Sequence, residues 1–308
     1  MQVLDGREVP LGGIRALTVR RTLPHRDRSF IGAWCFVDHY GPAPVGVDGS
    51  GGMDVPPHPH TGLQTVSWLF DGEIEHRDSG GNHAMVRPGE VNLMTGGRGI
   101  AHSEVSTPAT HVLHGVQLWV ALPEEARQHE RSFEHFAPQR AALPGEAGTA
   151  YVFLGALGNV AASPVKTHTP LLGAQLDLVP GAMLDLRLDP AYEHGVLLDI
   201  GALSVAGRDL AFGDLACFDA GRDSLTLAAG PAGARVVLLG GLPFEEEIVM
   251  WWNFVARTHD EIVEARDEWE ASSDRFGDVP GYAGAVARIP APPLPSGRLR
   301  SRNRSGRT

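Results

Sequence analysis

Cysteine is scarce in this sequence of 308 residues: Cys35 and Cys217 are the only two, and they lie far apart with no Cys-x-x-Cys spacing. This scarcity excludes a disulfide-stapled scaffold and a zinc site built from thiolates. No apolar run reaches the length of about 18 residues that a transmembrane helix needs. The N-terminus also lacks the basic and then apolar pattern of a secretion signal. We therefore expect a cytoplasmic protein without membrane association.

Positive charge is also in short supply. Lys and Arg number 26 against 37 Asp and Glu, which gives a net charge of −11. An acidic chain repels phosphate backbones, and no helix-turn-helix, zinc-finger or basic-helix pattern occurs, so we expect no direct contact with nucleic acid. Basic residues gather only near the C-terminus, where residues 298–307 hold five arginines and no acid. We expect this end to be a solvated, largely disordered tail, with a weak anion-binding arm as the alternative.

Glycine and proline are abundant instead, at 38 and 23 residues, and they divide the chain into many short apolar segments. Residues 65–70 form a β-rich run that meets Asp71-Gly72, a strong hairpin signal, and continues at residues 73–76. Residues 84–86 and 91–94 flank a second turn at Pro88-Gly89. Short strands with regular turns are typical of an antiparallel sandwich or barrel. We therefore expect an all-β protein.

The second half repeats this pattern from about residue 173 to residue 239. The sequence around Glu193-His194 loosely resembles the sequence around His58–His60. We therefore expect two similar barrels, of which only the first keeps a set of histidines. One helix is predicted near the end of the chain. Thr258 and Glu261 have capping-box spacing, and apolar residues follow on one face up to Glu270.

Two pairs of metal-binding side chains stand out in the first half. His58 and His60 are two residues apart, and so are His102 and Glu104. On a strand, residues i and i+2 face the same side, so two strands can present four ligands into one barrel. Three imidazoles and a carboxylate suit iron, nickel, copper, manganese or zinc. A single histidine is more often a surface or hydrogen-bonded residue, but two such pairs in an all-β context indicate a metal site.

The sequence resembles the pirin family, a branch of the cupin superfamily. The resemblance lies in FVDHYGP (36–42), in HPHTGLQTVSWLFDGEIEHRDS (58–79) and in PGEVNLMTGGRGIAHSE (88–104). It implies a bicupin fold of two antiparallel jelly-roll barrels, the first metal-binding and spanning residues 1–130. A degenerate second barrel with the terminal helix would span 131–273, and a largely disordered tail 274–308. Gln64 stands where many relatives have glutamate.

The resemblance also implies a site and a function. His58, His60, His102 and Glu104 match the family's metal ligands, with Fe(II) as the expected ion and Ni, Cu, Mn or Zn as alternatives. One implied function is a quercetin 2,3-dioxygenase, which uses O2 to cleave an aromatic, flavonol-like substrate, with Glu104 as ligand and general base. The alternative is a non-catalytic, redox-sensitive metalloprotein that binds a protein partner and modulates transcription or metabolism.

Overall fold

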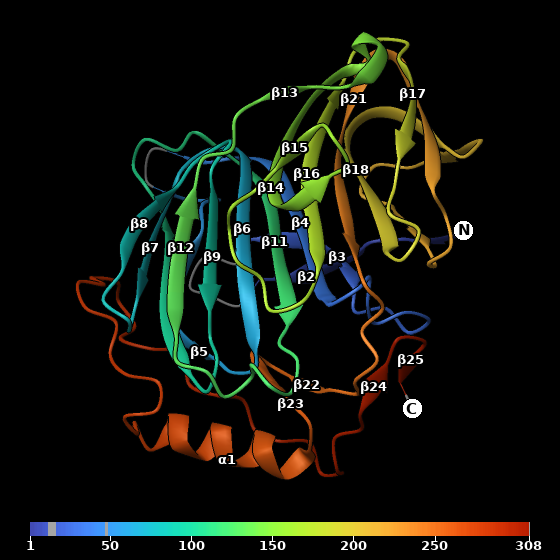
Figure 1. The fold of residues 1–308 in the computed structure, drawn as a ribbon. Helices are drawn as coiled ribbons and strands as arrows, with labels where there is room; N and C mark the ends of the chain where they lie inside the picture. The colour runs from blue at the N-terminus through green and yellow to red at the C-terminus, as the bar shows by residue number, and fades with distance from the viewer. Residues whose placement is uncertain (12–16, 47–48, 308) are drawn as a thin grey trace.

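The computed structural model describes residues 1–11, 17–46 and 49–307, and β-strands make up most of its ordered structure (Figure 1). Among the described residues, most strands belong to three antiparallel sheets, and α1 (His259–Glu270) is the one α-helix. The arrangement confirms the predicted all-β class, the two cupin barrels and the C-terminal helix. No helix in the described part of the chain has the length and apolarity needed to cross a bilayer.

The first half forms a barrel from two of these sheets. The larger sheet has the order β12-β9-β6-β11-β4-β3-β2, and the smaller one has the order β5-β10-β7-β8. Their strands are β2 (Arg7–Pro10), β3 (Thr18–Leu23), β4 (Trp34–Pro44), β5 (Asp54–His60), β6 (Leu63–Asp71), β7 (Ile74–Asp78), β8 (His83–Val86), β9 (Val91–Thr95), β10 (Ile100–Ser106), β11 (Val112–Ala121) and β12 (Ser132–Phe136).

The second half is built on one large sheet with the main order β1-β20-β18-β21-β16-β14-β13, and β15, β17 and β19 pair at its margins. Its elements are β1 (Gln2–Leu4), β13 (Ala141–Ala142), the 3-10 helix η1 (Pro144–Glu146), β14 (Gly148–Leu157), β15 (Ala161–Ala162), β16 (Leu171–Leu178), β17 (Met183–Arg187), β18 (Glu193–Val205), β19 (Arg208–Leu210), β20 (Leu215–Phe218) and β21 (Ser224–Gly241). Because β1 pairs with β20, the N-terminal strand belongs to the second barrel's sheet.

The hairpin predicted at Asp71-Gly72 is wrong. The turn is present, with Gly72 at a φ of 89°. The strands on its two sides do not pair, because β6 bonds to β9 and β11 whereas β7 bonds to β8 and β10. The turn at Pro88-Gly89 likewise connects β8 in the smaller sheet with β9 in the larger one. Both turns are therefore corners of the barrel at which the chain changes sheet.

Two strands of the second barrel are longer than the sequence pattern indicates. The apolar runs 195–200 and 203–206 fall in β18, apart from Ala206, which follows the end of that strand, and the runs 224–228 and 235–239 both belong to β21. The two strands stay paired through register shifts, one of which lies between Gly201 and Leu203. Gly201 has a φ of 86° at this point, and a side chain there would clash with the Gly233 carbonyl. Gly201 thus allows a bend within one long strand, where the sequence pattern predicts two separate strands.

The two barrels share a buried aromatic contact. Trp68 of β6 stacks on Phe153 of β14 with ring centroids 4.7 Å apart, and both residues are fully buried. The Trp68 indole also donates a hydrogen bond of 2.8 Å to the amide oxygen of Gln175 in β16. Burial of two large rings together with a satisfied indole N–H stabilises the packing of one barrel against the other.

The segment after β21 returns to the first barrel. Val255, in β23 (Phe254–Ala256), donates its backbone N–H to the carbonyl of Thr61 and pairs with β22 (Val249–Trp251). Helix α1 follows and lies below the first barrel in Figure 1. Thr258 caps the helix as predicted, since its hydroxyl accepts from the N–H of Glu261 at 3.2 Å. The Glu261 carboxylate bonds to the N–H of Arg257 instead of closing a capping box.

The expected disorder of the tail disagrees with the structure, which shows defined contacts there. The Trp269 indole donates to the carbonyl of Ile289 at 2.9 Å, and the N–H of Ile289 donates to Pro57 at 2.8 Å. Ala291 is buried against the helix, and β24 (Arg302–Asn303) pairs with β25 (Gly306–Arg307). Composition indicated a solvated end because few residues are apolar, but backbone groups supply much of the attachment. The boundaries at residues 130 and 273 stay predictions.

We predict that removal of residues 285–308 lowers the melting temperature by several degrees. The truncation leaves the Trp269 indole without its acceptor and uncovers the apolar cluster around α1. A buried donor without a partner costs about 1–3 kcal/mol, and each kcal/mol shifts the midpoint of a domain of about 150–250 residues by about 2–4 °C. Thermal unfolding followed by circular dichroism measures the change. Arg300→Ala, at an exposed tail position, serves as the control, and an unchanged melting temperature on truncation would contradict the attachment.

Candidate metal centre

Neighbouring strands of the smaller sheet carry the predicted histidines. His58 and His60 are on β5, and His102 and Glu104 are on the adjacent antiparallel strand β10. His102 lies directly opposite His58 in the register. A β-bulge between His102 and Glu104 shifts this pairing, so that Glu104 is opposite Val55. The alternation of side chains along each strand therefore turns all three imidazoles into the barrel.

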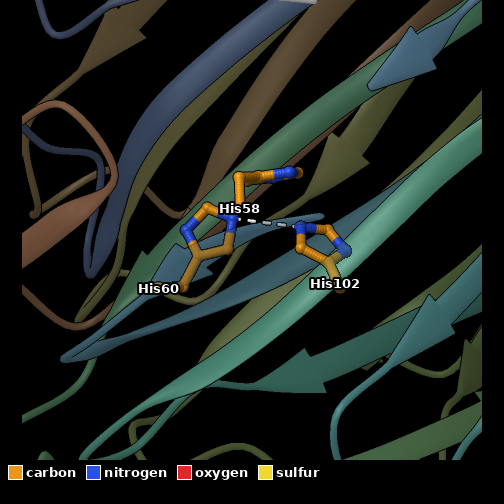
Figure 2. Close-up of side chains that lie close together, drawn as sticks. All are labelled: His58, His60 and His102. Atoms are coloured by element: carbon orange, nitrogen blue, oxygen red, sulfur yellow. Dashed lines mark hydrogen bonds between the residues drawn. The ribbon is translucent and has the colours of Figure 1, made fainter. Parts of the chain in front are cut away.

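The three imidazoles converge, as Figure 2 shows. One nitrogen from each ring lies within 4.8 Å of the other two. The Nε2 atoms of His60 and His102 are 3.0 Å apart, and the centroids of the His58 and His102 rings are 4.3 Å apart. Two nitrogens at right angles around one ion, each at about 2.1 Å, are separated by about 3.0 Å. The His60–His102 distance thus fits two ligands of one ion.

Burial makes these imidazoles neutral at physiological pH. It lowers the pKa of His58 to about 4 and holds the pKa of His60 and of His102 well below the usual value, with neighbouring imidazoles adding to the effect. A metal ion binds neutral imidazole, so little proton release opposes binding here. The Nδ1–H of His58 donates to the Pro56 carbonyl at 2.9 Å, which directs its Nε2 lone pair into the barrel. The residues present therefore fit a transition metal.

Glu104 lies next to the three-histidine group, and His102 is the residue that links the two. Its carboxylate belongs to a second potential ligand group with His102 and His76, in which the ligand atoms also lie within 4.8 Å of one another. Burial raises the pKa of Glu104, while His76 and the hydroxyl of Ser67 oppose the rise. Ser67 donates to Oε1 of Glu104 at 3.1 Å. The structure brings the three histidines together, and the complete four-ligand set stays a prediction.

His76 was not among the predicted ligands, because it lacks a second histidine at the same spacing, and it is 2% exposed on β7. Its Nδ1 lies 3.4 Å from Nδ1 of His102, and its Nε2 lies 3.2 Å from a carboxylate oxygen of Asp78. Asp78 also accepts from the backbone N–H groups of Gly80 and Asn82. Burial would raise the pKa of Asp78, but the hydrogen bonds from His76 and Asn82 lower it. The chain Asp78–His76–His102 therefore holds the His102 ring from behind. The His-x-Asp spacing of His76 and Asp78 on β7 was the sequence signal that could have predicted this pair.

A cavity of about 440 Å³ opens from these side chains, and His58, His60, His102 and Glu104 all line it. Apolar walls come from the first barrel, including Met53 and Trp119. Other lining residues come from the returning C-terminal segment, namely Met250, Trp252, Asn253, Ile289 and Arg302. Gln64 is not among the lining residues, since its amide bonds to Thr95 between β6 and β9. The cavity is closed in part by residues that lie far along the chain from the histidines, from Met250 to Arg302.

A separate histidine cluster joins the two barrels. His39 and His114 of the first barrel donate from Nε2 to the same carboxylate oxygen of Asp199 in β18, at 2.7 and 2.6 Å. Arg235 lies 3.0 Å from the other oxygen. Although three of these residues could bind an ion, the arginine already balances the Asp199 charge. We therefore assign this cluster to the contact between the barrels.

Comparison with known proteins places the chain among cupins of one family. The family described as Pirin matches residues 16–120, and the Pirin C-terminal cupin domain matches residues 173–277. A Pseudomonas aeruginosa protein named "Putative quercetin 2,3-dioxygenase" is 46% identical over 96% of this chain and 91% of its own length. A "Pirin-like protein" from Caulobacter vibrioides is 34% identical over 90% of this chain and 95% of its own.

A solved structure shares the whole architecture. The quercetin 2,3-dioxygenase from Acinetobacter baumannii superimposes with a TM-score of 0.89 at 38% identity, covering 97% of each chain. Its match extends over both barrels and the C-terminal segment.

We predict that His76→Gln weakens metal binding about 10- to 100-fold, the usual effect of removing a residue that orients a ligand. Glutamine keeps a polar side chain but cannot link His102 to Asp78 through a ring. Competition with a metal chelator measures the affinity, and circular dichroism checks the fold. His83→Gln, at an exposed histidine on β8, is the matched control. Equal affinity in His76→Gln and wild type would show that the Asp78–His76 pair does not support His102.

We also predict that the metal-free protein loses stability as the pH falls from about 6.5 to about 4. The pKa of His58 is about 4 in the folded chain, against 6.5 as the ordinary value. The unfolded chain therefore takes up the proton first, and the stability present above pH 6.5 declines as the pH drops. The difference corresponds to about 3 kcal/mol at most. Urea unfolding at pH 7.5, 6 and 5 measures it. We expect His58→Asn to make the free energy of unfolding less dependent on pH. The same pH slope in this variant as in wild type would contradict the assignment of the effect to His58.

Proposed function

The chain belongs to the pirin family of two-barrel cupin proteins, and on this premise we propose that it is a metal-dependent dioxygenase that opens the heterocyclic ring of flavonols such as quercetin. The proposed reaction adds O2 across the heterocycle and releases carbon monoxide as the ring opens. The observation that carries the proposal is the neutral three-histidine group beside a buried carboxylate, all at one cavity. The names of the P. aeruginosa and A. baumannii relatives agree with it.

We propose that His58, His60, His102 and Glu104 hold one divalent transition metal, with Fe(II) as the expected ion and Ni, Cu, Mn or Zn as alternatives. When bound, such an ion supplies Lewis-acid stabilisation of negative charge on a substrate oxygen. The mixed nitrogen and oxygen donors suit these metals, and thiolates are not involved, since both cysteines are buried away from the cavity lining. The cytoplasmic location stays a prediction.

Glu104 is the residue to which we assign proton transfer. A carboxylate works best as a general base when its pKa approaches the working pH, and burial raises the pKa of Glu104 in that direction. The Ser67 hydroxyl donates to Oε1 and also contacts the amide oxygen of Gln117 at 3.0 Å. Oε1 is thereby held in place, and we propose that Oε2 accepts the proton of the flavonol 3-hydroxyl.

The cavity walls suit a flat aromatic substrate. Phe36 and Trp119 stack with ring centroids 3.9 Å apart and an angle of 11° between the rings, and both line the cavity. The Arg21 guanidinium lies 4.2 Å from the centroid of the Phe36 ring, so this wall combines aromatic rings with one cation. The volume of about 440 Å³ is within the range of about 300–1,000 Å³ typical of small-molecule pockets. The walls orient the rings of the flavonol, while the histidines and Glu104 face its hydroxyl and keto oxygens.

We predict that Glu104→Gln retains a measurable part of its metal while turnover of quercetin per bound metal falls about 10²- to 10⁴-fold, the range expected for a lost general base. Glutamine keeps the size and an oxygen donor but loses the basicity. Metal content per chain and the decay of the flavonol absorbance in air give the two numbers. Glu125→Gln, at an exposed position, is the matched control and keeps both.

Two results would contradict this proposal in different ways. Unchanged turnover per metal in Glu104→Gln would remove Glu104 as the base but leave the dioxygenase activity standing. No flavonol turnover by wild-type protein loaded in turn with iron, nickel, copper and manganese would remove the activity itself. The redox-sensitive metalloprotein would then be the better interpretation.

A further inference from the structure

The aromatic wall of the cavity at the metal centre ends in a cation. Arg21, Phe36 and Trp119 are on β3, β4 and β11, which are neighbouring strands of the larger sheet, and all three side chains line the cavity. The Arg21 guanidinium carbon lies 4.2 Å from the centroid of the Phe36 ring, and the Trp119 ring stacks on Phe36 at 3.9 Å. Both groups are too close to the ring to share one face, so they cover its two faces.

This stack leads from Arg21 to the histidines. The Trp119 ring also meets the His60 ring edge-on, with centroids 5.2 Å apart and an angle of 78°. The order along the wall is therefore His60, Trp119, Phe36 and Arg21. Neighbouring strands are about 4.8 Å apart, so Arg21 on β3 lies about 10 Å from Trp119 on β11. A flavonol held at the histidines by its 3-hydroxyl and keto oxygens can therefore reach Arg21 with its phenyl ring.

Arg21 is fixed in place by Asp38. The two residues lie directly opposite each other on β3 and β4. Nε and Nη2 of Arg21 donate to the two carboxylate oxygens of Asp38, each at 2.7 Å. The Asp38 side chain is fully buried, whereas the Arg21 side chain is 22% exposed, so the guanidinium is the accessible member of the pair. This pairing uses one edge of the guanidinium and does not use the N–H groups of Nη1.

The chemistry of the pair limits the group that it can bind. An arginine only donates hydrogen bonds, so the ligand must bring an acceptor oxygen to it. Asp38 already balances the charge of Arg21, so a neutral hydroxyl suits this position better than a second carboxylate. Folding alone does not account for the pair, because apolar residues in place of a buried ion pair are often neutral or stabilising. A rigidly held guanidinium at a cavity wall is well suited to recognition, since little side-chain freedom is lost on binding.

We propose that Arg21 is a specificity-determining residue that binds a hydroxyl group on the phenyl ring of the flavonol, and that Asp38 is the residue that positions it. This inference rests on the proposed function, because the direction of the substrate along the wall follows from its approach to the histidines. It narrows the substrate class to flavonols that carry hydroxyl groups on the phenyl ring.

The test compares quercetin with galangin, a flavonol that lacks the two phenyl-ring hydroxyls and is otherwise identical. Fluorescence titration of the full-length, metal-loaded protein without oxygen measures binding while no ligand is consumed. We expect quercetin to bind about 10-fold more tightly, as a hydrogen bond to a charged group allows. Arg21→Gln should bring the two dissociation constants close together, and Arg21→Lys should keep part of the preference. Arg20→Gln, on the opposite face of β3 and against Phe212, is the matched control and should keep the full preference.

A readout on the wild-type protein covers the case in which Arg21→Gln does not fold. In a ¹⁵N-arginine spectrum, the Nε–H signal that disappears in Arg21→Lys should shift when quercetin is added and shift much less with galangin. The proposal is overturned if wild type binds the two flavonols equally, or if this signal responds equally to both. It is also overturned if Arg21→Gln, shown to be folded by circular dichroism, keeps the full preference.

Failure of this inference can be told apart from failure of the dioxygenase activity. A preference for quercetin that depends on Arg21, without ring opening in air, would support the role of Arg21 and remove the dioxygenase activity. Ring opening of both flavonols with the same KM would leave that activity standing and overturn the role of Arg21.

Discussion

Burial of three converging imidazoles, with Glu104 beside His102, is the constraint on which the first barrel depends. Polar side chains inside a barrel destabilise it unless they are paired or bind an ion, and here burial keeps the imidazoles neutral and the carboxylate pKa raised. Neutral imidazoles and a basic carboxylate are also what metal binding and proton transfer require. The same desolvation thus makes the site costly for folding and suited to chemistry.

Much of the surrounding structure supports this group from outside. Asp78 and His76 hold the His102 ring from the next strand, and Ser67 holds Glu104 from the facing sheet. The C-terminal segment lines part of the cavity and is bonded to β5 through Ile289–Pro57 and to the residue after β5 through Val255–Thr61. Since β5 carries His58 and His60, the tail and the metal centre are mechanically connected. Loss of the tail therefore bears on the site as well as on stability.

The two barrels share a fold and differ in what they bury. In the first barrel, several titratable side chains face one another and one ion can satisfy them together. At a cavity of the second barrel, His194 is the single histidine among the lining residues. Contacts such as Trp68 on Phe153 and Asp199 between two histidines join the two barrels.

Local patterns in the sequence were enough for the all-β class, the helix cap at Thr258 and the spacing that sends His58, His60 and His102 to one side of their strands. Each of these depends on residues within a few positions of one another, so short-range geometry decides it. Strand partners were decided by the tertiary structure: a turn lies at Asp71-Gly72, but β6 pairs with β9 and β11 in the larger sheet, whereas β7 pairs with β8 and β10 in the smaller one. The approach of His76 to His102 and the attachment of the tail through Trp269 likewise join residues that are far apart in the sequence. These contacts form only when the barrels fold, so the local sequence around each residue does not predict them.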